Sequence, residues 1–172
     1  LSYLFKLQLS MKKLYNLLRV KHYIKNFIIF APLLFTTGLE NTVNFLNVLI
    51  IFIIFCILAS IVYILNDIVD LKLDKLHPQK KYDKPLASGL IKLKNAKIIL
   101  FSLILLLILF LNFYPKYLQI STIYILLNIV YSFFLKHVFL VDIFSLSLNY
   151  IVRVYAGCVS LDVYLSNWMA VT

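Results

Sequence analysis

The chain has 172 residues, of which 63% are hydrophobic and 14% are charged, and its mean hydropathy is +0.94. A water-soluble domain of this length cannot bury so much apolar side chain, so the composition excludes a soluble globular protein and predicts a membrane protein. The net charge of +10 could suggest nucleic-acid binding, but the lysines cluster beside apolar runs. Membrane topology and attraction to anionic lipid or phosphate explain lysines in such positions better, which argues against nucleic acid as a partner.

Five apolar segments are long enough to cross a bilayer as α-helices, which takes about 20 residues each. They cover residues 23–39, 43–65, 96–114, 117–135 and 138–160, and the stretch 167–172 has the composition of the beginning of a sixth span. Neither a repeat of 20–50 residues nor a low-complexity linker interrupts the series. We therefore expect an all-α, polytopic transmembrane helical bundle that forms a single domain over residues 1–172.

Connections rich in lysine and arginine alternate along the chain with connections that have few or none, as the positive-inside rule requires. Six of them lie before residue 26 and seven lie in the long connection 66–95, whereas the turn 36–44 has none. We therefore expect a multi-pass protein of the cell's inner membrane, with its amino terminus and the connections 66–95 and 135–138 in the cytoplasm. The connection 66–95 is the longest polar segment, and we expect it to be the active-site loop.

The end of the second apolar run carries Asn66, Asp67, Asp70 and Asp74. Steps of three and four residues place these side chains on one face of a helix. Three nearby carboxylates repel one another unless a cation binds between them, and burying one near lipid costs about 2–3 kcal/mol. Oxygen ligands select a hard cation, Mg²⁺ first, which usually arrives with substrate phosphates. We expect all four residues to hold Mg²⁺ and the three aspartates to be catalytic; the alternative is a solvated helix end.

Polar side chains elsewhere in the chain are placed to bind phosphate groups. A lysine beside a membrane most often serves topology, but beside a divalent-metal cluster it also supplies the point charge that a polyphosphate needs. An arginine about ten residues deep in the last span must find an anion, a carbonyl group or water, and both structural pairing and phosphate binding stay open for it. The candidate substrate-binding residues are Lys25, Asn26, Lys80, Lys81, Lys84, Tyr131, Lys136, Asp142 and Arg153.

These motifs resemble the UbiA superfamily of intramembrane prenyltransferases. Its first signature is an N-D-x-x-D-x-x-x-D run, which Asn66, Asp67, Asp70 and Asp74 match without a gap. Two further stretches narrow the resemblance to the decaprenyl-phosphate phosphoribosyltransferase branch. Residues 18–33 resemble its opening L-R-P-x-x-W-x-K-N…F-A-P-L, and residues 77–89 resemble its H-P-x-K-R-x-R-P-x-A-S-G. The departures are Val20 for proline, Tyr23 for tryptophan, and Asp83-Lys84 where x-Arg precedes the second proline.

The resemblance implies a Mg²⁺-dependent transferase of cell-envelope biosynthesis that moves phosphoribose from 5-phosphoribosyl 1-diphosphate onto a polyprenyl phosphate. The near alternative is transfer of a polyprenyl group from its diphosphate onto an aromatic acceptor such as 4-hydroxybenzoate. An alternative of another class is an inactive remnant or a non-catalytic lipid-binding membrane protein. Because the superfamily's second polar motif lies beyond the length of this chain, we expect an amino-terminal part of an enzyme or the product of a broken gene.

Overall fold

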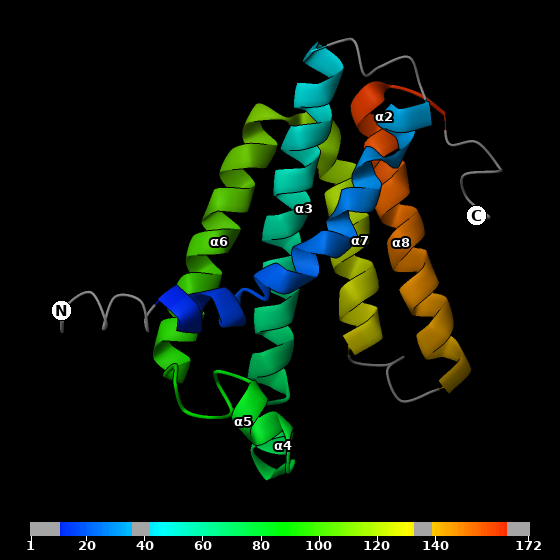
Figure 1. The fold of residues 1–172 in the computed structure, drawn as a ribbon. Coiled ribbons are helices and arrows are strands. Elements are labelled where there is room, and N and C mark those ends of the chain that lie inside the picture. Colours follow the sequence, from blue (N-terminus) through cyan, green and yellow to red (C-terminus); the bar gives the residue numbers. More distant parts are fainter. Residues whose placement is uncertain (1–10, 36–41, 133–138, 165–172) are drawn as a thin grey trace. The chain divides into compact units, whose positions relative to one another are not determined.

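The computed structural model describes residues 11–35, 42–132 and 139–164, and every regular element within these ranges is a helix (Figure 1). In chain order the elements are η1 (Val20–Phe30), α2 (Ala31–Phe35), α3 (Thr42–Val69), α4 (Leu71–Leu76), α5 (Lys80–Asp83), α6 (Leu93–Phe113), η3 (Pro115–Tyr117), α7 (Leu118–Val130) and α8 (Phe139–Leu161). The prediction of an all-α protein is confirmed.

Within the described ranges, three helices have the length and the apolar composition of membrane spans: α3, α6, and Ile143–Leu161 within α8. They correspond to three of the five expected spans. The expected span 117–135 contains α7, whose 13 residues rise roughly 20 Å and so fall short of the hydrocarbon core. Its expected continuation beyond residue 132 lies outside the described residues.

The first expected span, 23–39, is not one α-helix. Residues Val20–Phe30 form a 3-10 helix, and α2 begins at Ala31, directly before Pro32. Proline lacks the N–H that a continuing helix would use, but it is tolerated in the first turn of a new helix. Because a 3-10 helix rises about 2.0 Å per residue, η1 and α2 have a summed length of roughly 30 Å, comparable to the hydrocarbon core.

The described residues form two compact units. Unit 1 consists of the described parts of 1–23 and 59–106, and unit 2 consists of those of 24–58 and 107–172. Compactness is a different property from independent folding, so a single domain over the whole chain stays a prediction.

Unit 1 has a small apolar core to which four parts of the sequence contribute one residue each. Leu17 of the amino-terminal segment packs with Ile64 of α3, Leu86 of the polar connection and Ala96 of α6. All four side chains are almost completely buried. The Ser60 hydroxyl of α3 also donates a hydrogen bond of 3.1 Å to the backbone carbonyl of Leu18. These contacts position the amino-terminal segment and the connection 77–92 beside the carboxyl-terminal end of α3.

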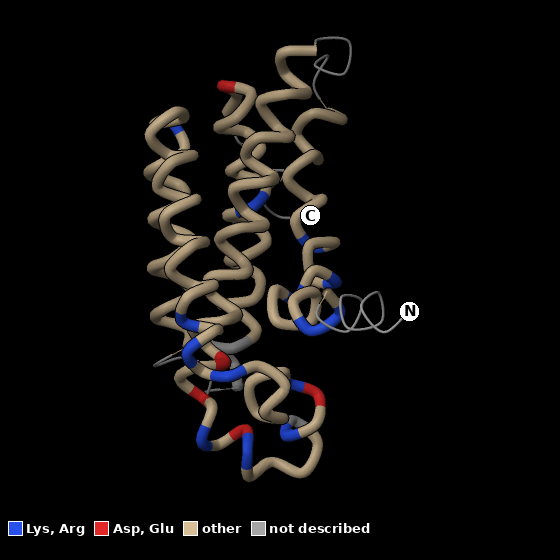
Figure 2. Tube along the Cα trace, turned by 90° about the vertical axis from the view of Figure 1, so that its left-hand side faces the viewer, with Lys and Arg blue, Asp and Glu red and all other residues tan. Residues whose placement is uncertain are grey.

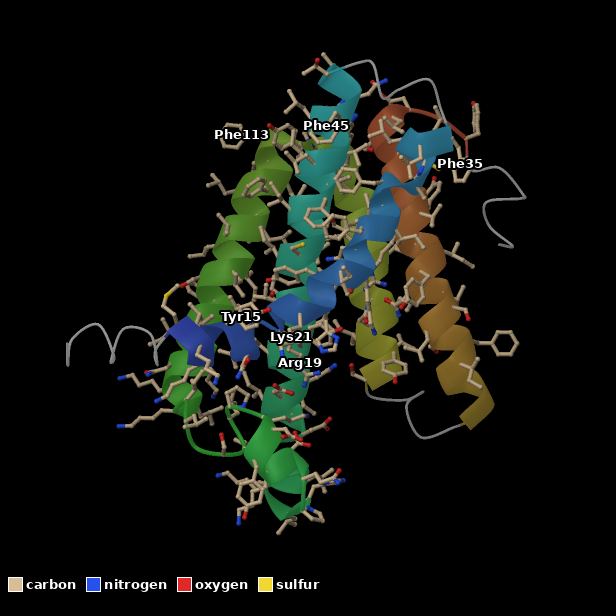
Figure 3. All side chains as sticks on the ribbon, viewed as in Figure 1. Tyr15, Arg19, Lys21, Phe35, Phe45 and Phe113 are labelled. Carbon is tan, nitrogen blue, oxygen red and sulfur yellow. The ribbon has the colours of Figure 1, made fainter. Side chains whose placement is uncertain are left out.

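Unit 2 is organised around α8, which packs against α2 and α7. The close approach depends on Gly157, because a Cβ atom there would overlap the backbone carbonyl oxygen of Ile29 and touch the ring of Pro32. The helix ends of this unit carry exposed phenylalanine rings at one end of the unit (Figure 3), namely Phe35, Phe45 and Phe113. Aromatic rings at helix ends are typical of a membrane–water interface.

Candidate functional site

The four residues of the acidic motif lie where α3 passes into α4. Helix α3 ends at Val69, and Asp70 follows as the N-cap of α4 without capping through its side chain. The helical hydrogen-bond pattern nevertheless continues, because Asp70 N–H donates to the Asn66 carbonyl and Asp74 N–H donates to the Asp70 carbonyl, each at 2.9 Å. Asp70 itself has a φ of −84° and a ψ of 3°, so α3 and α4 are not one continuous α-helix. Asp67 and Asp74 nevertheless lie close together, because Lys84 contacts both of them.

The four residues of the motif differ in their exposure to solvent. Asp67 is 1% exposed and Asp74 is 3% exposed, whereas Asn66 and Asp70 are only partly buried. A buried carboxylate is strongly destabilising unless cations and hydrogen-bond donors surround it. Asp67 and Asp74 must therefore be compensated within the unit, and two basic side chains from distant positions do this.

Lys84 bridges the two buried carboxylates. Its Nζ lies 2.6 Å from Asp74 Oδ2 and 3.1 Å from Asp67 Oδ1. Burial by itself lowers the pKa of Lys84, but the hydrogen bond with Asp74 and the negative charge of Asp67 raise it more, so the net shift is upward from 10.5. Lys84 therefore carries its positive charge at neutral pH and acts as the shared counter-ion of both aspartates.

Arg19 supplies the second positive charge. Its Nη2 donates a hydrogen bond of 2.7 Å to Asp67 Oδ1, and its guanidinium carbon lies 4.7 Å from the centroid of the Tyr63 ring. The backbone of Arg19 has a φ of 53°, a left-handed conformation that costs a non-glycine residue energy. The packing of Leu17 and the ion pair with Asp67 hold Arg19 in this conformation. Strain of this kind is often found at functional sites.

A cavity of about 410 Å³ adjoins these charges. It is lined by Tyr15, Asn16, Arg19, Lys21, His22, Asp67, Asp83, Lys84 and Pro85. Figure 3 shows that Tyr15, Arg19 and Lys21 come from one amino-terminal segment. Figure 2 shows basic residues on that segment and residues of both signs on the polar connection. The lining carries three basic and two acidic side chains, a composition suited to a polar, phosphorylated ligand.

The oxygen atoms at this site fit a hard divalent cation. Asp67 Oδ2 is buried and has no hydrogen-bond partner within the described part of the chain. The described residues contain no group of three or more His, Cys, Asp or Glu side chains placed to hold a metal ion. Magnesium in phosphate-transfer sites usually takes one or two carboxylates together with substrate phosphates, so Asp67 and Asp74 match this pattern. Metal binding by all four residues of the motif, and catalysis by its three aspartates, stay predictions.

Five lysines were predicted to bind substrate, and of those that the structure describes, Lys84 is the one in the lining of this cavity. Lys81 is exposed, with its Nζ 5.7 Å from the centroid of the Tyr82 ring. Lys80 begins α5, but its side chain lies outside the description, and Lys136 lies outside the described residues altogether. Lys25 is partly buried on η1. Phosphate binding by these four lysines stays a prediction.

Arg153 and Asn26 belong to unit 2, where they form a buried polar network. Arg153 Nε donates to Asn26 Oδ1 at 2.9 Å, Nη1 donates to the Asn149 carbonyl at 2.7 Å, and Nη2 donates to the Tyr124 hydroxyl at 3.0 Å. Arg153 is 6% exposed and Asn26 is 1% exposed. These contacts support the structural alternative for Arg153, while substrate binding by either residue stays a prediction.

The remaining predicted residues also belong to unit 2. Tyr131 is the partly buried C-cap residue of α7. Asp142 lies in α8, and its side chain is outside the description. Neither placement tests the predicted contact with substrate.

Sequence reasoning missed seven residues that line the cavity: Tyr15, Asn16, Arg19, Lys21, His22, Asp83 and Pro85. A signal existed for Arg19, since it lies in the stretch that resembles the superfamily's opening motif. Its partner Asp67 is 48 residues away, and no spacing pattern links the two positions. Lys21 could be recognised only as one of several basic residues before the first span.

Comparisons with known proteins agree with the resemblance. The model of the UbiA prenyltransferase family matches residues 27–172. The protein y4nM of Sinorhizobium fredii, described as uncharacterized, is 28% identical over 155 residues, which are 88% of this chain and 30% of that protein. Two proteins named decaprenyl-phosphate phosphoribosyltransferase are also similar. The one from Mycolicibacterium smegmatis is 29% identical over 87% of this chain and 48% of its own length, and the one from Corynebacterium glutamicum is 31% identical over 88% and 47%.

The chain thus spans about half the length of these two transferases and less than a third of y4nM. The family match nevertheless covers all three helices that have the properties of membrane spans. The chain is an integral membrane protein and belongs to the UbiA prenyltransferase family.

Proposed function

We propose that the chain belongs to a Mg²⁺-dependent transferase that moves phosphoribose from 5-phosphoribosyl 1-diphosphate onto a polyprenyl phosphate. The relatives named decaprenyl-phosphate phosphoribosyltransferase support this choice of donor and acceptor. The observation that carries the proposal is a pair of buried carboxylates, Asp67 and Asp74, that Lys84 bridges beside a polar cavity lined by Asp67 and Lys84.

The polar cavity is the proposed site of the donor. Asp67 and Asp74 would hold Mg²⁺, and Arg19, Lys21 and Lys84 would bind the phosphate oxygens of the donor. Bound Mg²⁺ would neutralise the diphosphate and stabilise the charge that develops on it as it leaves. An entirely polar donor of this kind suits the lining better than a donor with a long apolar tail.

The acceptor in this proposal is a lipid phosphate, which is already ionised at neutral pH. One of its oxygens attacks the anomeric carbon of the ribose, the bond from that carbon to the diphosphate breaks, and no general base is required. Exposed apolar side chains of α6, among them Ile98 and Phe101, would contact the lipid tail or the bilayer. We place the carboxylate cluster on the cytoplasmic side of the inner membrane, on the argument of the basic connections.

The alternative is prenyl transfer, in which the lipid carries the diphosphate and an aromatic acid accepts the prenyl group. The description of the family model as a prenyltransferase family favours it. The carboxylates and Lys84 would then bind the same diphosphate group, but the cavity would have to admit an apolar chain.

Ligand binding distinguishes these alternatives. The full chain in lipid nanodiscs would be titrated calorimetrically with 5-phosphoribosyl 1-diphosphate and with geranyl diphosphate, each with and without Mg²⁺. We expect Mg²⁺-dependent uptake of the phosphoribosyl donor and its loss in Asp67→Asn. Uptake of geranyl diphosphate without uptake of the phosphoribosyl donor would replace the proposal with the prenyl-transfer alternative. Uptake of neither compound would favour a non-catalytic protein.

A further inference from the structure

The ammonium group of Lys84 is bound to the same carboxylates that the proposed function assigns to Mg²⁺. Its Nζ lies within direct contact distance of Asp74 Oδ2, at 2.6 Å, and of Asp67 Oδ1, at 3.1 Å. A magnesium ion binds carboxylate oxygens at about 2.0–2.1 Å and requires near-octahedral geometry. An ammonium group and a divalent cation therefore cannot bind between these two oxygens at the same time.

The charges at the cluster balance without a metal ion. Asp67 and Asp74 contribute two negative charges, and Lys84 and Arg19 contribute two positive charges in direct contact with them. A divalent cation added to this set would leave two uncompensated positive charges in a buried site, which is unfavourable. Its binding requires that Lys84 leaves and that an anion enters nearby.

The structure offers Lys84 a place to move to, because its side chain is part of the lining of the 410 Å³ cavity. The backbone next to Lys84 is anchored, since Pro85 and Leu86 are buried and Leu86 belongs to the core of unit 1. The lysine side chain, in contrast, is a flexible four-carbon stem. A rotation of this side chain would move the ammonium group from the carboxylates into the cavity, while Pro85 and Leu86 keep the backbone in place.

We infer that Lys84 is an exchangeable internal counter-ion, which neutralises Asp67 and Asp74 until a divalent cation replaces it and which then binds a phosphate group of the ligand in the adjoining cavity. This inference rests on the proposed function for the identity of the ligand. It makes metal binding and diphosphate binding mutually dependent, because each relieves the charge imbalance that the other creates. The metal alone binds weakly, and the metal with a diphosphate binds tightly.

The test compares Lys84→Met with Lys75→Met in the full chain in lipid nanodiscs. Lys75 is an exposed residue of α4 next to Asp74, so the control removes the same charge from the same region without touching the carboxylates. Mn²⁺, which electron paramagnetic resonance detects in its free form, is titrated as the metal alone. Equilibrium dialysis then measures the uptake of labelled pyrophosphate with and without Mn²⁺.

The inference predicts opposite changes in the two measurements. Lys84→Met should bind Mn²⁺ alone at least about tenfold more tightly than the parent, because an open form populated at a tenth or less weakens the apparent affinity by that fraction. The same variant should bind pyrophosphate with Mn²⁺ more weakly, and Lys75→Met should change neither affinity. A Lys84 that only binds phosphate would leave the affinity for Mn²⁺ alone unchanged, and a purely structural Lys84 would weaken both; either result overturns the inference.

Two further measurements keep the test decisive if Lys84→Met is poorly stable. Mn²⁺ should raise the melting temperature of Lys84→Met more than that of the parent, since the metal supplies the missing counter-ion. Lys84→Arg, which keeps the charge, should bind Mn²⁺ alone as weakly as the parent does; tight binding by this variant contradicts the exchange. If the parent takes up no pyrophosphate with Mn²⁺, the proposed function fails, while the titration with Mn²⁺ alone still decides the role of Lys84.

Discussion

Replacing Arg153 by methionine tests whether this buried arginine stabilises the fold or binds substrate. The substitution removes the three hydrogen bonds that Arg153 donates to Asn26, Tyr124 and the Asn149 carbonyl, while a side chain of similar length still fills the space. A hydrogen bond to a charged group contributes about 1.5–3 kcal/mol, and each buried partner left unsatisfied costs about 1–3 kcal/mol. Because the three bonds share one side chain and are not additive, we expect a loss of about 3–5 kcal/mol.

A loss of this size should be visible as a lower melting temperature. At about 2–4 °C per kcal/mol for a protein of this length, Arg153→Met should melt at least about 6 °C below the parent. A thiol-reactive fluorogenic dye is a suitable probe, since Cys56 and Cys158 are both buried and become reactive when unit 2 opens. Tyr124→Phe, which removes one hydrogen bond to the charged Arg153, should cost about 1.5–3 kcal/mol and lower the melting temperature less than Arg153→Met does.

Ligand binding completes the test of Arg153. Below the melting temperature, folded Arg153→Met should retain the Mg²⁺-dependent affinity of the parent for 5-phosphoribosyl 1-diphosphate. A variant that melts like the parent would refute the structural role derived from the three hydrogen bonds. A variant that is stable but no longer binds the donor would instead establish Arg153 as a phosphate-binding residue.

Three other predictions follow from particular contacts. Asp67→Asn should abolish Mg²⁺-dependent binding of the phosphoribosyl donor and transferase activity without changing membrane insertion, as measured by calorimetry and by fractionation; near-normal binding would remove Asp67 from the metal site. Gly157→Ala should destabilise the chain by about 1–3 kcal/mol, because the added methyl group overlaps the carbonyl oxygen of Ile29. Gly89 has open space around it and a φ of 74°, so Gly89→Ala should lose stability through backbone strain instead. Equal melting temperatures of Gly157→Ala and the parent would contradict the close approach of α8. The pKa of Lys84 is raised above 10.5 in the folded state, so its ion pairs stabilise the fold fully below about pH 10.5 and lose this effect as the pH rises through the folded-state pKa. The melting temperature, measured by circular dichroism, should therefore fall more steeply above pH 10.5 in the parent than in Lys84→Met. Parallel dependence on pH in the two proteins would argue against stabilising ion pairs of Lys84.

Local sequence information determined the membrane class and the position of the acidic motif. Long apolar runs predict spanning helices because the bilayer requires about 20 such residues, and three of the five predicted spans are α-helices of spanning length. The steps between Asp67, Asp70 and Asp74 predict a shared helical face, and the structure brings Asp67 and Asp74 to a common partner, Lys84, although a new helix begins after Asp70. The local sequence also explains why a new helix, α2, begins at Ala31, because Pro32 lacks the N–H that a continuing helix would use.

Tertiary structure decided which groups neutralise the buried aspartates and which groups accept hydrogen bonds from the buried arginine. Arg19 is 48 residues from Asp67, and Arg153 is 127 residues from Asn26. Sequence patterns describe residues that are neighbours along one helix. These pairs form only when distant parts of the chain fold together, because each buried charge then requires a polar or charged partner. Lys84 could be recognised as a phosphate-binding candidate, but its position between Asp67 and Asp74 depends on the packing of Leu17, Leu86 and Ala96 in the core of unit 1.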